Sequence, residues 1–137
     1  MIKKLSIQPA SGLQGDLSVP GDKSVSHRGL ILGAISQGTT TLHHFLPAAD
    51  CLSTLTALQK LGVPIKRVDT TVTISGRGLR GLTQPQQPLD MGNAGTATRL
   101  LTGLLAGQPF ETTLVGDTSL SPVSYTHLRA HETGRNL

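Results

Sequence analysis

Two stretches of this 137-residue sequence share one pattern, and this repeat constrains the fold more than any other feature. In the first stretch, a glycine turn at Gly21 leads into an apolar helical segment that carries Arg28 seven residues after the glycine. Gly92 and Arg99 have the same spacing, 71 residues further along the chain. Each helical segment leads to a strand-like segment that contains Thr-Thr-Leu. Such repeats are typical of folds that stack one supersecondary unit, because a single unit cannot bury its own apolar faces.

The periodicity of apolar residues predicts an α/β fold. Helical spacing predicts three helices at residues 24–36, 49–61 and 95–106, of which Gly38 and Gly62 are expected to end the first two. Asp50 is expected as an N-cap or a first-turn acid of the second helix. Alternating or β-branched segments predict strands at 3–8, 13–19, 39–45, 65–68, 71–75 and 110–115. A glycine- and proline-rich loop is expected at 76–88. The first complete unit therefore has the order βαβαββ.

The residues around the first glycine turn suit an anionic ligand. The first N–H groups of a helix have no partner within the helix, and the helix dipole is positive at that end. Lys23, Ser24 and Arg28 add an ammonium, a hydroxyl and a guanidinium, and Ser24 and Arg28 share a helix face because they are four residues apart. These groups favour a phosphate or a carboxylate. The spacing alone is equally compatible with solvated surface charges at a helix start.

The second glycine turn offers a similar site. Gly92 and Gly95 permit a tight turn and let a ligand approach the backbone, and Asn93 is expected to cap the following helix. Taken alone, this stretch is more simply an ordinary glycine turn, with Arg99 holding the turn through backbone carbonyls. The repeat favours a second anion site at a helix N-terminus.

Composition narrows the class of protein. The formal net charge is +4, but the basic residues form no dense run and aromatic residues make up only 2% of the chain, so no nucleic-acid surface is predicted. No membrane-spanning run and no signal peptide are recognised. The single cysteine, Cys51, allows no internal disulfide, which fits the reducing cytoplasm, and it is expected to be a small core residue. His43 and His44 are adjacent on an expected strand and point to opposite faces, so no metal site is predicted.

Three motifs in order carry a family resemblance. They are Pro20 to Arg28 (PGDKSVSHR), Leu89 to Arg99 (LDMGNAGTATR) and Gly116 to Ser121 (GDTSLS). Together they resemble the signatures of the EPSP synthase (3-phosphoshikimate 1-carboxyvinyltransferase) family, and the resemblance covers residues 1 to about 121. The family implies an inside-out α/β barrel built from βαβαββ repeat units in two domains, which is incomplete here.

The resemblance also implies a reaction. Family members transfer the enolpyruvyl group of phosphoenolpyruvate to the 5-hydroxyl of shikimate 3-phosphate and release phosphate, as monomers without a metal or an organic cofactor. Carried over to this sequence, Lys23 would contact both substrates, Ser24 and Arg28 shikimate 3-phosphate, and Gly95 phosphoenolpyruvate. The turn would be supported by Asn93, Thr96 and Arg99. His27 is expected to pack and to form hydrogen bonds, and not to carry a proton.

The sequence departs from the family pattern in two places. Leu100 stands where many members have proline. After Ser121 the family continues with an Arg-Pro-Met segment whose arginine binds phosphoenolpyruvate, whereas residues 122–137 resemble translated sequencing-adapter sequence. We therefore expect residues 1–121 to be part of a transferase domain and residues 122–137 to be a non-native tail, in which Arg129 does not replace the missing arginine. The chain alone is predicted to be inactive, and no catalytic residue is assigned in it.

Two other functions stay open from the sequence. One is the sibling reaction, enolpyruvyl transfer to a UDP-amino sugar, although the Asp-Lys-Ser-x-Ser-His-Arg signature favours shikimate 3-phosphate. The other is a non-enzymatic anion-binding module that is complete at 137 residues, which a tail that pairs into the sheet would support.

Overall fold

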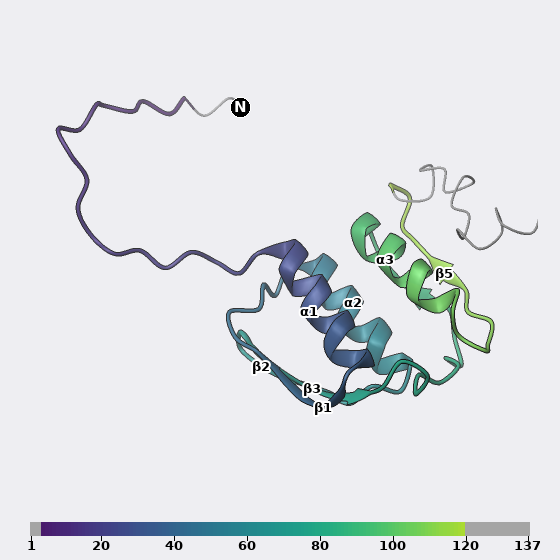
Figure 1. Ribbon diagram of the computed structural model, residues 1–137. Helices are drawn as coiled ribbons and strands as arrows, with labels where there is room; N and C mark the ends of the chain where they lie inside the picture. The colour runs from purple at the N-terminus through teal and green to yellow at the C-terminus, as the bar shows by residue number, and fades with distance from the viewer. Residues whose placement is uncertain (1–3, 120–137) are drawn as a thin grey trace, which may run out of the picture.

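A computed structural model describes residues 4–119 of the chain. Residues 4–22 contain no helix or strand, and residues 4–19 extend away from the rest of the molecule (Figure 1). The strand predicted at 13–19 is therefore wrong, and so is the part of the strand at 3–8 that the structure describes. The five large apolar residues of this segment are 70–92% exposed: Leu5, Ile7, Leu13, Leu17 and Val19. Their alternation marks the side that a strand would bury, but a strand forms only beside a partner.

The first helix and the first strand follow the turn at Gly21. Helix α1 spans Lys23–Ile35 and strand β1 spans Gln37–Leu42. The C-cap of α1 is Ser36 in extended geometry, and Gly38 lies within β1 with φ of +86°, so the prediction that Gly38 ends the helix is wrong. Strand β1 also ends before the two histidines that were expected on it, and His44 has φ of +56°.

A three-stranded antiparallel sheet lies on one side of α1. Its strands are β1, β2 (Ile65–Val68) and β3 (Thr71–Arg77), in the order β1-β3-β2. The hairpin β2–β3 confirms the prediction from its alternating residues, and Val72 and Ile74 are fully buried beneath the helices. Helix α1 approaches the sheet closely at Gly33, because a Cβ there would lie 2.8 Å from Ile74 Cδ1.

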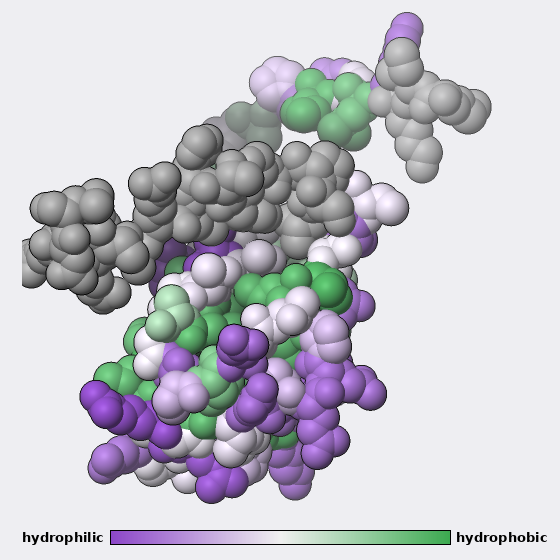
Figure 2. Space-filling model, turned by 90° about the vertical axis from the view of Figure 1, so that its right-hand side faces the viewer, coloured by the Kyte–Doolittle hydropathy of each residue, from purple (hydrophilic) through white to green (hydrophobic). Residues whose placement is uncertain are grey.

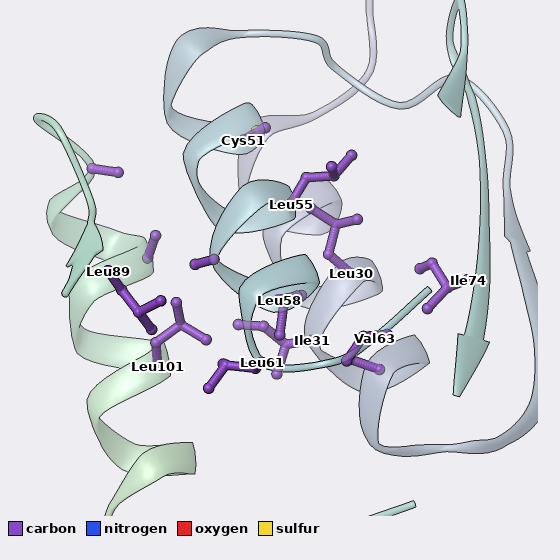
Figure 3. Packing of buried hydrophobic residues seen from close by; sticks show 14 of the residues in the cluster. Leu30, Ile31, Cys51, Leu55, Leu58, Leu61, Val63, Ile74, Leu89 and Leu101 are labelled. Atoms are coloured by element: carbon purple, nitrogen blue, oxygen red, sulfur yellow. The ribbon is translucent and has the colours of Figure 1, made fainter. Parts of the chain in front are cut away.

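Helix α2 (Ala49–Lys60) occupies the centre of the structure and contacts both α1 and α3 (Gly95–Leu105). Leu58 of α2 is fully buried, as is Leu61 just after the helix, and both lie among side chains from the neighbouring elements (Figure 3). Cys51 is also fully buried on α2, which confirms its predicted place in the core. Gly62, with φ of +86°, follows the end of α2 as predicted.

Two short strands hold the second glycine turn. Strand β4 (Leu89–Asp90) pairs in parallel with β5 (Leu114–Val115), 25 residues further along the chain. Strand β4 was not predicted, and the strand predicted at 110–115 is confirmed only for its last two residues. Within residues 4–119, no helix is long and apolar enough to cross a membrane.

Candidate functional site

The N-terminus of α1 is capped by a side chain of its own motif. Asp22 is the N-cap, and its Oδ1 accepts a hydrogen bond of 2.7 Å from the Val25 N–H. The carbonyl of Asp22 accepts the bond from the Ser26 N–H at 3.0 Å. Of the first three N–H groups of α1, the cap satisfies one, and those of Lys23 and Ser24 are left for a ligand. This cap was not predicted, although an aspartate directly before a helical segment is its usual signal.

The three predicted anion-binding side chains lie together on the exposed surface at the start of α1. Arg28 Nη1 donates to the backbone carbonyl of Ser24 over 3.2 Å, so the shared face predicted from their spacing is confirmed. Lys23 Nζ forms an ion pair of 3.0 Å with Asp50 Oδ2 in the first turn of α2. The hydrogen bond from Lys23 to Asp50, followed by the charge of that carboxylate, raises the pKa of the lysine. A cluster that is open to solvent and mostly cationic suits a phosphate or a carboxylate.

A buried polar layer lies directly beneath this surface. His27 is fully buried, and its Nδ1 lies 2.9 Å from Thr54 Oγ1 on α2. Its Nε2 lies 3.9 Å from Cys51 Sγ, and that thiol also faces the Lys23 carbonyl at 3.7 Å. Burial lowers the pKa of His27 and raises the pKa of the Cys51 thiol, so both groups are neutral near pH 7. His27 thus packs and forms hydrogen bonds, as predicted.

This layer predicts a pH dependence of stability. Because the pKa of folded His27 lies below its ordinary value of 6.5, the unfolded chain binds more protons in the window between the two values. The free energy of unfolding should therefore fall as the pH is lowered through this window, beginning near 6.5. Urea unfolding between pH 8 and pH 5 measures this slope.

A matched pair of variants isolates the contribution of His27 to that slope. His27→Gln should remove the fall in the free energy of unfolding that begins near pH 6.5, whereas His44→Asn should retain it. His44 is the suitable control because it is exposed and sits at φ of +56°, a conformation that asparagine tolerates. An unchanged slope in the His27 variant would contradict a neutral, buried His27.

The second motif forms a backbone-bonded turn before α3. Gly92 has φ of +52°, and its N–H donates to Asp90 Oδ1 over 2.9 Å. The Ala94 N–H bonds to the Met91 carbonyl, and Ala94, not Asn93, is the N-cap of α3. The prediction that Asn93 caps the helix is therefore wrong, because the turn is closed one residue later than expected. The Asn93 carbonyl accepts from the Gly95 N–H at 3.1 Å.

The structure joins the second and third motifs. The carboxyl ends of parallel strands meet at the same edge, and β4 and β5 here lead directly into these two motifs. The Asp117 N–H donates to the Gly92 carbonyl over 2.9 Å. Asp117 Oδ1 accepts bonds from both the N–H and the hydroxyl of Ser119. Thr96 and Arg99 are exposed on the first turns of α3.

The first and second motifs both approach α2 at its N-terminal half. Lys23 contacts Asp50 in the first turn of this helix, and a Cβ at Gly92 would lie 3.6 Å from Ser53 Oγ, three residues further along it. Beside the second motif, an open cavity of about 350 Å³ lies between α2 and the turn, lined partly by Ser53, Lys60, Asp90 and Gly92. Among residues 4–119, no three histidine, cysteine or acidic side chains are grouped to hold a metal ion.

A known protein family matches most of the chain. A model of the family EPSP synthase (3-phosphoshikimate 1-carboxyvinyltransferase) matches residues 7–122, which is most of the chain. The chain belongs to the EPSP synthase family. The match spans all three motifs and includes every binding residue that the sequence resemblance assigned.

Relatives of the family show how much of a whole protein this chain represents. It is 61% identical over 110 residues to the 3-phosphoshikimate 1-carboxyvinyltransferase of Limosilactobacillus fermentum, covering 80% of this chain and 26% of that protein. It is 55% identical over 118 residues to the 3-phosphoshikimate 1-carboxyvinyltransferase of Oceanobacillus iheyensis, and this match covers 85% of this chain and 28% of that protein. The EPSP synthase structure from Acinetobacter baumannii superimposes with a TM-score of 0.77 at 48% identity, over 80% of this chain and 25% of that one. The chain thus spans about a quarter of its relatives' length.

Proposed function

We propose that the whole protein represented by this segment transfers the enolpyruvyl group of phosphoenolpyruvate to the 5-hydroxyl of shikimate 3-phosphate, with release of phosphate. The observation that carries the proposal is the exposed cationic cluster at the start of α1, in a chain that belongs to this family. Both substrates are multiply anionic, so helix N-termini and basic side chains suit them. We place this reaction in the cytoplasm, in a monomer.

The residues have separate roles in this proposal. Lys23 contacts both substrates, and Ser24 and Arg28 bind the phosphate of shikimate 3-phosphate. The tight turn at Gly95 receives phosphoenolpyruvate, supported by Asn93, Thr96 and Arg99. The support comes from position, because the first and second motifs both approach the N-terminal half of one helix, α2, at Asp50 and Ser53.

The fold proposal extends the coarse α/β architecture. The observed order from α1 to β3 is αβαββ, which is the order of a βαβαββ unit of an inside-out barrel without its first strand. We propose that residues 1–121 are part of such a domain and that residues 122–137 are a non-native tail. The end of the family match at residue 122 supports this boundary. Sequencing the gene across codons 119–137 tests it: a locus that continues as Arg-Pro-Met supports the proposal, and one that reads through residues 122–137 unchanged contradicts it.

We expect the 137-residue chain alone to show no turnover. The side of the molecule that carries α3 and β5 exposes apolar surface between its polar side chains (Figure 2). On α1, Val25 and Leu32 are 67% and 62% exposed, although both are large apolar residues. Surfaces of this kind mark sites of further packing. The assay is phosphate release from shikimate 3-phosphate and phosphoenolpyruvate, and detectable release by the purified chain would contradict the expectation.

A chimera tests the proposed function itself. Residues 1–115 of this chain, joined to the remaining part of the Limosilactobacillus fermentum relative, should release phosphate from the two substrates. Lys23→Ala in the chimera should lower kcat/KM by about 10- to 100-fold, which is the effect of losing one or two charge-assisted hydrogen bonds. An inactive chimera beside an active relative would sink the proposal, and turnover with a UDP-amino sugar in place of shikimate 3-phosphate would favour the sibling reaction.

A further inference from the structure

The N-terminal halves of α1 and α2 are joined by polar contacts in matching register. Lys23 contacts Asp50 at 3.0 Å, and one turn further along, His27 contacts Thr54 at 2.9 Å. The two partners are four residues apart on each helix, so both contacts lie on the same facing sides. The contact between His27 and Thr54 is fully buried and fixes how the two helices align. This alignment places the carboxylate of Asp50 opposite Lys23.

Asp50 is held more firmly than the lysine it contacts. It lies in the first turn of α2, where the helix dipole favours a negative charge. The Asp50 side chain is 28% exposed, against 51% for Lys23. The backbone of Lys23 is also held, because its carbonyl faces the thiol of Cys51 at 3.7 Å. The fixed partner is thus the carboxylate, and the adjustable one is the ammonium.

A lysine needs such a partner if it is to serve as a defined anion contact. Its four-carbon stem is flexible, and ordering it costs rotamer entropy. A bond to Asp50 uses one of the three N–H donors of the ammonium and leaves two for a ligand. We propose that Asp50 is a positioning residue that holds the Lys23 ammonium beside the N-terminus of α1 so that it contacts a bound anion. The identity of that anion rests on the proposed function, but the positioning does not.

Nitrogen-detected NMR of the 137-residue chain tests the positioning without any enzyme assay. The variants are Asp50→Asn, Asp50→Glu and the matched control Asp69→Asn. Asp69 is exposed in the β2–β3 turn at φ of +50°, so asparagine fits there and the same charge is removed far from the site. Asp50→Asn should lower the pKa of Lys23 toward its ordinary value, and the other two variants should retain the raised value.

Inorganic phosphate then serves as the probe of anion contact. In the wild-type chain, saturating phosphate should shift both the Lys23 Nζ resonance and the Ser24 amide. In Asp50→Asn, the Lys23 response should fall at least twofold relative to that of Ser24, and Asp50→Glu should restore it. An unchanged Lys23 response or an unchanged lysine pKa in Asp50→Asn would overturn the proposal, and so would the same loss in Asp69→Asn. Absence of any phosphate-induced shift at Lys23 in the wild-type chain would overturn it as well.

The chimera separates failure of this proposal from failure of the proposed function. In an active chimera, Asp50→Asn should lower kcat/KM at least tenfold, Asp50→Glu should recover it to within about threefold, and Asp69→Asn should leave it unchanged. An active chimera that keeps its kcat/KM within twofold in Asp50→Asn would overturn the positioning and leave the function intact. If the unaltered chimera is inactive, the function fails, and the NMR results on the chain decide the positioning by themselves.

Discussion

Replacing Leu58 by alanine is expected to lower the free energy of unfolding of the chain by about 2–5 kcal/mol. Leu58 is fully buried on α2, the helix that contacts both α1 and α3, so the lost side chain leaves a cavity at the centre of the core (Figure 3). The reason for the large effect is that the surrounding helices cannot all collapse into that cavity. Urea unfolding followed by circular dichroism measures the change.

Two further variants serve as a surface control and as a milder core substitution for this prediction. Leu32→Ala makes the same chemical change on α1, where the side chain is 62% exposed, and should change stability by less than about 0.5 kcal/mol. Because natural domains have only about 5–15 kcal/mol of stability, Leu58→Ala could abolish the folded baseline. Leu58→Met conserves volume and should cost less than about 1.5 kcal/mol. Equal losses in Leu58→Ala and Leu32→Ala would show that Leu58 is not a central core residue in solution.

Local patterns in the sequence were sufficient for the elements that local interactions specify. Helix α2 follows from the leucines spaced along it and from Gly62 and Pro64 after it. The hairpin β2–β3 follows from alternating residues on both sides of a short turn. In both cases the backbone hydrogen bonds join residues that are close in the sequence, so a local pattern is enough to predict the element.

The strands that need distant partners could not be predicted in this way. Strands β4 and β5 have two residues each and pair across 25 positions of the chain, and such short strands have no period of their own. The opposite error occurs at residues 4–19, where alternating apolar residues predict strands that have no partner among the described residues. Alternation tells which face of a strand is apolar, but the strand itself requires hydrogen bonds from another segment.

The candidate site likewise has one part that the local sequence predicts and one part that depends on contacts between distant residues. The exposed cluster of Lys23, Ser24 and Arg28 follows from helical spacing around one turn, and the structure confirms that the three lie together. Asp50 was expected as an N-cap or a first-turn acid of its own helix, and the structure has it in the first turn, with Ala48 as the N-cap. Its contact with Lys23 joins residues 27 positions apart, and it depends on the register that His27 and Thr54 set between α1 and α2.

A second large effect is expected at the turn that introduces the cluster: Gly21→Ala should cost about 1–3 kcal/mol of stability. A Cβ at Gly21 would lie 1.8 Å from the His44 carbonyl oxygen and 3.0 Å from the Leu46 nitrogen. The backbone of this loop would have to retreat, and it holds α1 through a 3.0 Å bond from the Leu46 N–H to Ser26 Oγ. Urea unfolding gives the cost, and the amide shifts of Ser26 and Leu46 show whether the loop has moved.

A second glycine-to-alanine substitution, in α3, is the control, and it is expected to raise the stability of the chain instead of lowering it. Gly103 lies inside α3 with no other atom near the position of a Cβ, apart from the backbone of its own helix, so Gly103→Ala should stabilise the chain by about 0.5–1 kcal/mol through helix propensity. If Gly21→Ala changed stability by less than about 0.5 kcal/mol and left the Leu46 amide in place, the close approach of this loop to the turn would be refuted. A loss at Gly21 beside a gain at Gly103 would instead show that Gly21 is required because a backbone carbonyl occupies the space of a side chain. The start of α1, and with it the position of Lys23 and Ser24, would then depend on that contact.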